Sequence, residues 1–297
     1  MGSSSCFRYH LGAVAAVIFW GLSFIAAKYA MRELPPFVLA TVRFLIASAI
    51  FMVIIAVRGW HILPEPQERI PVLFLGFLGV TFLFALQYSG IYLTSSAQAS
   101  ALVGAAPIFI ALLSVWLLGE QIPIRTLAGI IVAFAGMTVV ISHGSLAGFR
   151  SGTNLIGSSM ILLNSLSWAL FSVLGKKYSF RYHPMQLTGY VSIAGTILLL
   201  PLGVVQAIFS PVPFHLSLGT WCAVLFLSVF CSVLGYWLWY EALAHVKAST
   251  IGVYLYGEQA VTFAFAPLLI GEKLGYALLF GTALIILGIV IVARRDI

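Results

Sequence analysis

The chain has 297 residues, of which 62% are hydrophobic and only 8% are charged, with a net charge of +7. Soluble domains carry about 25% charged residues, so this chain cannot cover a water-facing surface, and the composition predicts an integral membrane protein whose solvent is the lipid bilayer. Three cysteines do not make a disulfide framework. The basic residues form no run interleaved with aromatic residues, so we expect no nucleic-acid partner.

A helix that spans the hydrocarbon core of a bilayer needs about 20 residues. The stretches 70–119 and 182–240 contain no Asp, Glu, Lys or Arg, and each is long enough for two such helices. Dividing the chain at proline, glycine and polar breaks predicts ten helices. Their ranges are 11–30, 36–57, 70–90, 96–118, 123–142, 154–175, 184–208, 217–240, 249–270 and 274–293.

The second half of the chain repeats the first. "FWGLSFIAAKYA" (19–30) matches "SWALFSVLGKKY" (167–178), which aligns Trp20 with Trp168 and Lys28 with Lys176 at an offset of 148 positions. "LLGEQI" (117–122) matches "LIGEKL" (269–274) after a further shift of four positions. The first predicted helix could pass for the core of a signal peptide, but its pattern recurs inside the chain, so we expect it to be retained.

Each repeat holds five predicted helices, and an odd number makes the second repeat enter the membrane from the opposite side. We therefore predict an all-α integral membrane protein with ten transmembrane helices, built as two inverted five-helix repeats at 11–142 and 155–294. Transporters use such inverted repeats to build alternating access around a site at the middle of the bilayer. A Ser- and Gly-rich connector, 142–154, joins the two repeats.

The basic residues predict the orientation, because cytoplasmic loops are enriched in Lys and Arg. With a cytoplasmic N-terminus, ten basic residues fall on the cytoplasmic side and four on the other side. The ten are Arg8, Arg58, Arg69, Arg125, Lys176, Lys177, Arg181, Lys247, Arg294 and Arg295, and the four are Lys28, Arg32, Arg150 and Lys273. We expect both termini to be cytoplasmic.

The ordered motifs resemble the drug/metabolite transporter superfamily, in its EamA-type branch. They are Trp20-Gly21, "LPPFVLATVRFLIA" (34–47), the spacing from Pro107 to Gly119-Glu120, and Gly271-Glu272. The resemblance covers nearly the whole chain. It implies a ten-helix secondary carrier that exports amino acids or related small metabolites across the plasma membrane. The second half departs from the pattern, with Val191 where the first half has Arg43, and with "YGEQ" (256–259) where a proline-containing stretch is common.

Two charged residues fall inside predicted spans, where a charge costs at least about 2.5–3.5 kcal/mol. Glu258 lies near the middle of the ninth span, so it either faces a central cavity, where it binds a substrate amine or cation or carries a proton, or ties two helices as a neutral acid. Tyr254 lies four residues earlier and would share its helix face. Arg43 cannot lose its charge. It either binds a substrate carboxylate, pairs with Glu258, or reaches outward to the membrane surface or between helix ends.

Further candidates for substrate contacts are aromatic and neutral polar residues. They are Trp20, Trp168, Asn164, Gln87, Tyr88 and Gln98. The two tryptophans could equally be packing residues. The aromatic residues of "GYWLWYEAL" (235–243) are predicted to form a belt at the membrane surface.

Prolines and glycines mark positions where the predicted helices bend or pack. Pro107 lies inside the fourth span, where it removes a backbone donor and forms a kink or hinge, and Pro267 is expected to act similarly. Glycines at 129, 136, 281 and 288 allow close packing of helices from the two halves or from two protomers. Glu120 and Glu272 precede helices and are interpreted as structural.

Catalytic and metal-binding motifs are absent from the sequence, and we expect no enzyme activity, cofactor or metal. The predicted function is a secondary transporter that exports amino acids or related metabolites through a midplane cavity between the repeats, with protons as a candidate coupled ion. The alternative that the sequence leaves open is a non-catalytic membrane scaffold or a receptor-like protein.

Overall fold

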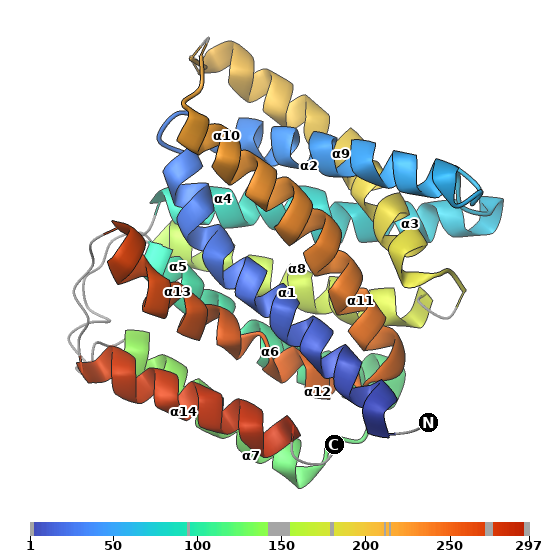
Figure 1. The fold of residues 1–297 in the computed structure, drawn as a ribbon. Coiled ribbons are helices and arrows are strands. Elements are labelled where there is room, and N and C mark those ends of the chain that lie inside the picture. The colour runs from blue at the N-terminus through green and yellow to red at the C-terminus, as the bar shows by residue number, and fades with distance from the viewer. Residues whose placement is uncertain are drawn as a thin grey trace.

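A computed structural model describes residues 3–93, 96–141, 155–178, 181–210, 212–213, 215–270 and 276–293. All regular secondary structure within these residues is helical, and the helices form one layered bundle (Figure 1). Apolar chain in lipid must satisfy its backbone donors and acceptors internally, and a helix does so within a single segment. The start of α1 and the end of α14 lie at the same end of the bundle in Figure 1.

The described helical elements group into ten segments, five in each half, because several elements follow one another directly. The elements of the first half are α1 (Ser3–Ala30), α2 (Pro36–Val57), η1 (Pro66–Glu68), α3 (Arg69–Gly76), η2 (Phe77–Phe82), α4 (Leu83–Leu93), α5 (Ser96–Val103), α6 (Ala106–Leu118) and α7 (Ile124–Ile141). Those of the second half are α8 (Leu155–Tyr178), α9 (Pro184–Phe209), α10 (Leu218–Leu225), η4 (Phe226–Leu234), α11 (Gly235–His245), α12 (Ala248–Val253), α13 (Tyr256–Ile270) and α14 (Tyr276–Ala293). The fold class predicted from the sequence is confirmed.

Six of the described segments are continuous, long and apolar enough to cross a bilayer. They are Phe7–Ala30, Pro36–Val57, Pro66–Leu93, Ser159–Tyr178, Pro184–Phe209 and Leu218–His245. The fourth segment of each half is interrupted, at 104–105 between α5 and α6 and at 254–255 between α12 and α13. These breaks divide the fourth and the ninth segments into two shorter helices each.

Local sequence explains several helix ends. Pro36 and Pro184 occupy the first position of α2 and α9, where a missing N–H costs no hydrogen bond. Gly119 ends α6 in the left-handed region with φ of 65°. The eighth segment continues to His245, five residues beyond the predicted end at 240. A helix is not obliged to stop at the edge of the hydrocarbon, so bilayer thickness sets a minimum length and not an end point.

The packing of the helices follows the sequence repeat. α2 packs against its repeat partner α9, and α7 packs against its repeat partner α14, at opposite edges of the bundle in Figure 1. The contact of α1 with α11 has a counterpart in the contact of α8 with α4, and that of α1 with α13 has a counterpart in that of α8 with α6. Such reciprocal contacts are what a two-fold relation between the halves produces.

Single residues on the pseudo-two-fold axis contact their own repeat partners. The hydroxyl groups of Ser48 and Thr196, which are 148 positions apart, are hydrogen-bonded at 2.8 Å. The rings of Trp20 and Trp168, at the same offset, meet edge to face with centroids 5.0 Å apart. The axis therefore passes between α2 and α9 and through the contact of these two tryptophans.

The glycines of α7 and α14 hold the two halves together. A Cβ at Gly136 would lie 2.6 Å from the carbonyl oxygen of Gly281, and one at Gly288 would lie 2.7 Å from that of Gly129. The two contacts are repeat counterparts, and a side chain at either position would collide with backbone. Of the two roles predicted for this spacing, the structure supports packing between the halves.

Candidate functional site

Two π-helical segments shape the centre of the bundle. η2 and η4 occupy corresponding places in the third segment of each half, and π-helical turns inside α-helices are frequently found at functional sites. Side chains from other segments donate to the carbonyls in or beside them. Tyr236 Oη donates to Gly79 at 2.9 Å, Ser167 Oγ to Leu78 at 2.8 Å, and Trp20 Nε1 to Cys231 at 2.9 Å. The widened turns thus become attachment points between the halves.

A cavity of about 50 Å³ lies among these helices. A water molecule needs about 10–15 Å³ by this measure, so the cavity has room for a few waters. Its walls come from both halves. Six of its lining residues were candidates from the sequence, namely Trp20, Arg43, Gln87, Asn164, Trp168 and Glu258.

Arg43 is buried at one wall of the cavity with 2% of its surface exposed. Its Nε donates to Ser232 Oγ at 2.7 Å, and its Nη1 donates to Tyr88 Oη at 3.0 Å. Its guanidinium carbon lies 4.5 Å from the centroid of the Phe84 ring, a distance at which cation–π attraction contributes. The interpretation that Arg43 reaches outward to the membrane surface is therefore wrong.

Glu258 lines the same cavity from the first turn of α13 and is 6% exposed. The described residues supply no hydrogen bond to its carboxyl group and no ion pair with Arg43. A carboxylate near a helix N-terminus is favoured by the helix dipole, but a charge buried away from water needs a partner. The cavity thus holds two ionisable side chains of opposite type without a direct ion pair.

An aromatic cluster forms another part of the wall. Trp20 and Trp168 both pack against Tyr236 and Trp239, with centroid distances between 5.3 and 5.9 Å. Tyr236, Trp239 and Tyr240 are at most 1% exposed. The predicted surface belt is wrong for these three residues, because their side chains face α1 and α8 and pack against aromatic rings inside the bundle.

Several lining residues were not among the candidates from the sequence. They include Ser23, Phe24, Phe84, Tyr236 and Leu255. Tyr236 could have been found, since it lies 148 positions after Tyr88 and so repeats a candidate residue. The others are ordinary apolar or small residues of a membrane span, and their sequence carries no signal.

Other candidates lie near the cavity without lining it. Tyr88 accepts a hydrogen bond from Arg43, which lines the cavity. Tyr254 Oη is hydrogen-bonded to His10 Nδ1 at 2.9 Å. Tyr254 falls in the break before α13, so the predicted shared face with Glu258 on one continuous helix does not form.

Of the two prolines predicted to act as hinges, the structure describes the side chain of Pro107 alone. Pro107 lies in the first turn of α6, directly after the break at 104–105, and not in the interior of a continuous helix. The side chains of Gln98 and Pro267 lie outside the described part of the structure. Within that described part, no three His, Cys, Asp or Glu side chains gather in a group that could hold a metal ion.

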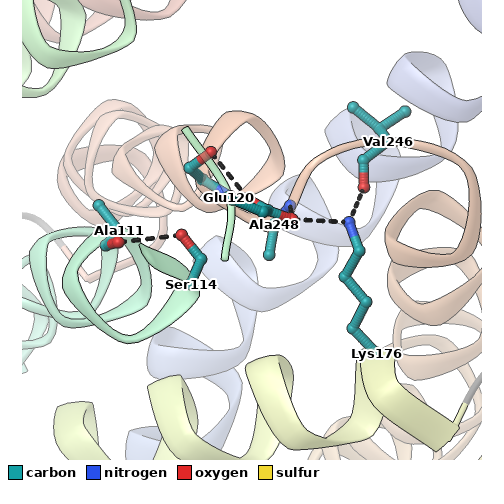
Figure 2. A network of polar contacts seen from close by, with 7 residues as sticks. Ala111, Ser114, Glu120, Lys176, Val246 and Ala248 are labelled. Atoms are coloured by element: carbon teal, nitrogen blue, oxygen red, sulfur yellow. Dashed lines mark hydrogen bonds and ion pairs between the residues drawn. The ribbon is translucent and has the colours of Figure 1, made fainter. Parts of the chain in front are cut away.

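A second polar network joins the halves at one end of the bundle (Figure 2). Lys176 of α8 forms an ion pair with Glu120 at 3.0 Å and donates to the carbonyl of Val246 at 2.6 Å. Glu120 also accepts from the backbone N–H groups of Ala248 and Ser249, at 3.0 and 3.3 Å. Glu120 therefore caps the start of α12 in the other half, whereas its sequence position suggested the start of α7.

The electrostatics of this network favour a charged Glu120. Burial acts to raise the pKa of Glu120, but the Lys176 ammonium and the N–H donors at the start of α12 outweigh it. The pKa of the carboxyl group therefore lies below its ordinary value. We call Glu120, Lys176 and the first residues of α12 the inter-half clamp.

Comparisons with known proteins agree with this architecture. A protein of Archaeoglobus fulgidus described as an "Uncharacterized transporter" is 33% identical and is matched over 97% of this chain and 98% of its own length. A protein of Escherichia coli described as a "Probable amino-acid metabolite efflux pump" is 26% identical over 94% of this chain and 92% of its own length. A solved structure, titled "Crystal structure of protein", covers 96% of both chains with a TM-score of 0.79 at 20% identity, which shows a shared fold.

The profile of the EamA-like transporter family matches the chain twice, at residues 7–142 and 155–294. The two matches together span most of the sequence, and each covers one of the five-segment halves seen in the structure. The chain therefore belongs to the EamA-like transporter family, whose members are multi-pass membrane proteins.

Proposed function

We propose that this transporter exports amino acids or related small metabolites by alternating access at the central cavity. The observation that carries the proposal is the presence of Arg43 and Glu258 on the walls of one cavity between the halves. An amino acid carries a carboxylate and an ammonium group. Arg43 offers donors to the carboxylate, and Glu258 offers an acceptor to the ammonium.

The burial of both side chains supports this pairing with a ligand. Arg43 is 2% exposed and Glu258 is 6% exposed, and burying ionisable groups in a membrane protein is costly. Ionisable residues inside membrane spans commonly mark substrate or ion pathways. The resemblance of this chain to a probable amino-acid metabolite efflux pump points to the same substrate class.

The small volume of the cavity supports a conformational change during transport. A volume of about 50 Å³ holds a few waters and is too small for an amino acid, so the cavity must enlarge when a substrate binds. The interruptions at 104–105 and 254–255 are suitable hinges, because broken helices line the binding sites of many inverted-repeat transporters. In this proposal Pro107 fixes the start of α6 on one side of the first hinge.

We further propose that the protein lies in the plasma membrane with both termini in the cytoplasm. The excess of Lys and Arg on that side supports this orientation. Protons are the proposed coupled ion, with Glu258 as the group that carries them. No long-range charge relay is needed for this role, since Glu258 lines the substrate cavity directly.

Flux measurements in proteoliposomes test the proposal. Purified protein is reconstituted, and the efflux of a panel of labelled amino acids and of their decarboxylated amines is followed at several pH values. We expect Glu258→Gln to slow the flux at least tenfold and to flatten its pH dependence. Glu241→Gln is the matched control, because Glu241 lies on α11 and does not line the cavity.

Two results would contradict the proposal in different ways. Unchanged rate and pH dependence in Glu258→Gln would remove the role of that residue. Absence of flux for every compound with the wild-type protein would favour the alternative of a non-catalytic scaffold or receptor-like protein over amino-acid export.

A further inference from the structure

The two repeat-related tryptophans differ in what their indole N–H groups bind. Trp20 Nε1 donates to the carbonyl of Cys231 at 2.9 Å. The same offset of 148 positions pairs Cys231 with Leu83, so Leu83 offers the corresponding acceptor to Trp168. That carbonyl instead accepts from Asn164 Nδ2 at 2.9 Å. Trp168 Nε1 is buried and has no hydrogen-bond partner among the described residues.

A single residue accounts for this difference between the halves. The repeat partner of Asn164 is Ala16, which carries no polar group and is fully buried. In the first half, nothing competes with the tryptophan for the carbonyl. In the second half, the Asn164 amide occupies the acceptor.

A buried donor without a hydrogen bond costs free energy and is rare in folded proteins, so such a group needs an explanation. Trp168 is 9% exposed and Asn164 is 2% exposed, and both line the central cavity. The space that they face is the one in which the substrate is proposed to bind.

We propose that Asn164 is a positioning residue that keeps the Trp168 indole N–H available to the substrate. Asn164 donates to the carbonyl of Leu83, whose counterpart in the first half accepts from Trp20, and Trp168 Nε1 then donates to an acceptor oxygen of the ligand. The indole N–H is a donor only, so the ligand group is an acceptor, and in an amino acid this acceptor is a carboxylate oxygen. The inference rests on the proposed function, because it takes the ligand of this cavity to be the transported substrate.

The rings around Trp168 define the competing arrangement. Trp168 meets Trp20 and Tyr236 edge to face, with centroids 5.0 and 5.6 Å apart. An N–H group aimed at one of these ring faces would make a weak contact within the protein. In that arrangement Asn164 would have no influence on the indole, which makes the two cases separable.

The first measurement follows the indole N–H signals by NMR, in protein labelled with ¹⁵N-tryptophan. Trp168→Phe identifies the Trp168 signal by its loss. We expect Asn164→Ala to move this signal downfield, because the freed carbonyl of Leu83 becomes available as it is in the first half. A signal that Asn164→Ala does not move overturns the inference.

Ser167→Ala is the matched control for this measurement. Ser167 lies on the same helix, is 2% exposed, and donates to the carbonyl of Leu78 at 2.8 Å. It therefore makes the same kind of bond to the third segment as Asn164 does, but it does not line the cavity. We expect Ser167→Ala to leave the Trp168 signal in place, and movement of equal size would count against a specific role of Asn164.

The second measurement compares the KM values of labelled alanine, leucine and phenylalanine with those of the corresponding amines, which lack the carboxylate. One hydrogen bond is worth roughly a 3- to 10-fold change in affinity. We expect Asn164→Ala and Trp168→Phe each to raise KM for the amino acids by this factor and to leave KM for the amines unchanged. The double variant should be no worse than Trp168→Phe alone.

The outcomes separate this inference from the proposed function. Wild-type flux of amino acids together with equal losses for acids and amines in Asn164→Ala would overturn the inference and retain the function. If the wild-type protein moves none of the probes, the proposed function fails. The donation from Trp168 to a substrate then fails with it, and the N–H signal in Asn164→Ala decides only whether Asn164 keeps the Trp168 indole N–H unbonded.

Discussion

Replacement of Glu120 by Gln is expected to weaken the inter-half clamp in a way that depends on pH. The carboxylate is paired with Lys176 at 3.0 Å and accepts from the N–H groups of Ala248 and Ser249 and from Ser249 Oγ. Gln retains the shape and one acceptor oxygen but has no charge. The substitution therefore removes the electrostatic part of the clamp with little change in packing.

The expected loss of stability follows from the solvent exposure of the Glu120–Lys176 pair. The side chains of Glu120 and Lys176 are 10% and 13% exposed, so solvent screens them less than it screens a surface pair. Hydrogen bonds to charged groups contribute about 1.5–3 kcal/mol. After a discount for the remaining exposure, we expect Glu120→Gln to cost about 2 kcal/mol at neutral pH, which corresponds to a fall in Tm of a few degrees.

The direction of the pH dependence follows from the lowered pKa of Glu120 in the folded protein. A carboxyl group with a depressed pKa contributes stability that is fully present above its unfolded pKa, which is about 4.3 for Glu. That contribution is lost as the pH falls through the folded pKa. The difference in Tm between the wild-type protein and Glu120→Gln should therefore be constant above about pH 6 and shrink in more acidic buffer.

The assay is thermal unfolding in detergent at a fixed heating rate between about pH 4 and pH 8, since membrane proteins often unfold irreversibly. Glu65→Gln, in an exposed connection, is the control for a change in net charge. A gap that persists undiminished at the lowest pH would refute the electrostatic reasoning and assign the loss to packing. Lys176→Met should be destabilising too, and the double variant should cost less than the sum.

Three further predictions concern the cavity and the interface between the halves. Arg43→Lys should reduce amino-acid flux in proteoliposomes at least tenfold, because a single ammonium cannot replace the guanidinium that bonds Ser232 and Tyr88; wild-type flux would contradict this. Gly136→Leu should lower Tm by several degrees or prevent folding, whereas Gly12→Ala, where a Cβ would lie 3.5 Å from its nearest neighbour, should be tolerated. Ser48→Ala should cost about 0.5–1.5 kcal/mol in thermal unfolding, since it removes the hydrogen bond to Thr196 on the axis, and an unchanged Tm would count against that bond.

The number and order of the spans could be predicted because two physical constraints act on the sequence at once. Bilayer thickness sets a minimum helix length, and the internal repeat provides a second copy of each boundary. Pro36 and Pro184 illustrate this, since they are repeat partners and both begin a helix. Arg43 and Glu258 were recognisable for a related reason, because a charge within an apolar span is conspicuous.

The interruptions and π-helical turns could not be predicted in the same way. η2 and η4 consist mainly of apolar residues, and their sequences would equally suit a regular helix. The break at 254–255 consists of Tyr254 and Leu255, and neither residue is a proline or a glycine that would signal an interruption. Such deviations are set by tertiary contacts, such as the donation from Tyr236 to Gly79, which span segments far apart in the chain.

The aromatic residues of α11 were assigned to the wrong environment for a physical reason. Tyr and Trp suit both the membrane surface and a buried cluster, because each carries an apolar ring and one polar group. The two cases differ in which neighbouring helices cover the side chain, and those neighbours lie far away in the sequence. Tyr236 and Trp239 face α1 and α8, where they pack against Trp20 and Trp168.

The departures from two-fold symmetry matter more for the site than the symmetry itself. A cavity on an exact two-fold axis would present the same group to both ends of a ligand, and it could not distinguish a carboxylate from an ammonium. The repeat partner of Arg43 is Val191, and α5 and α6 contain no charged residue where the second half has Glu258. Asn164 and Ala16 add a third difference. The symmetric parts, such as the Ser48–Thr196 bond and the α7–α14 contact, hold the halves in register, whereas the unmatched residues would give a bound substrate its single orientation.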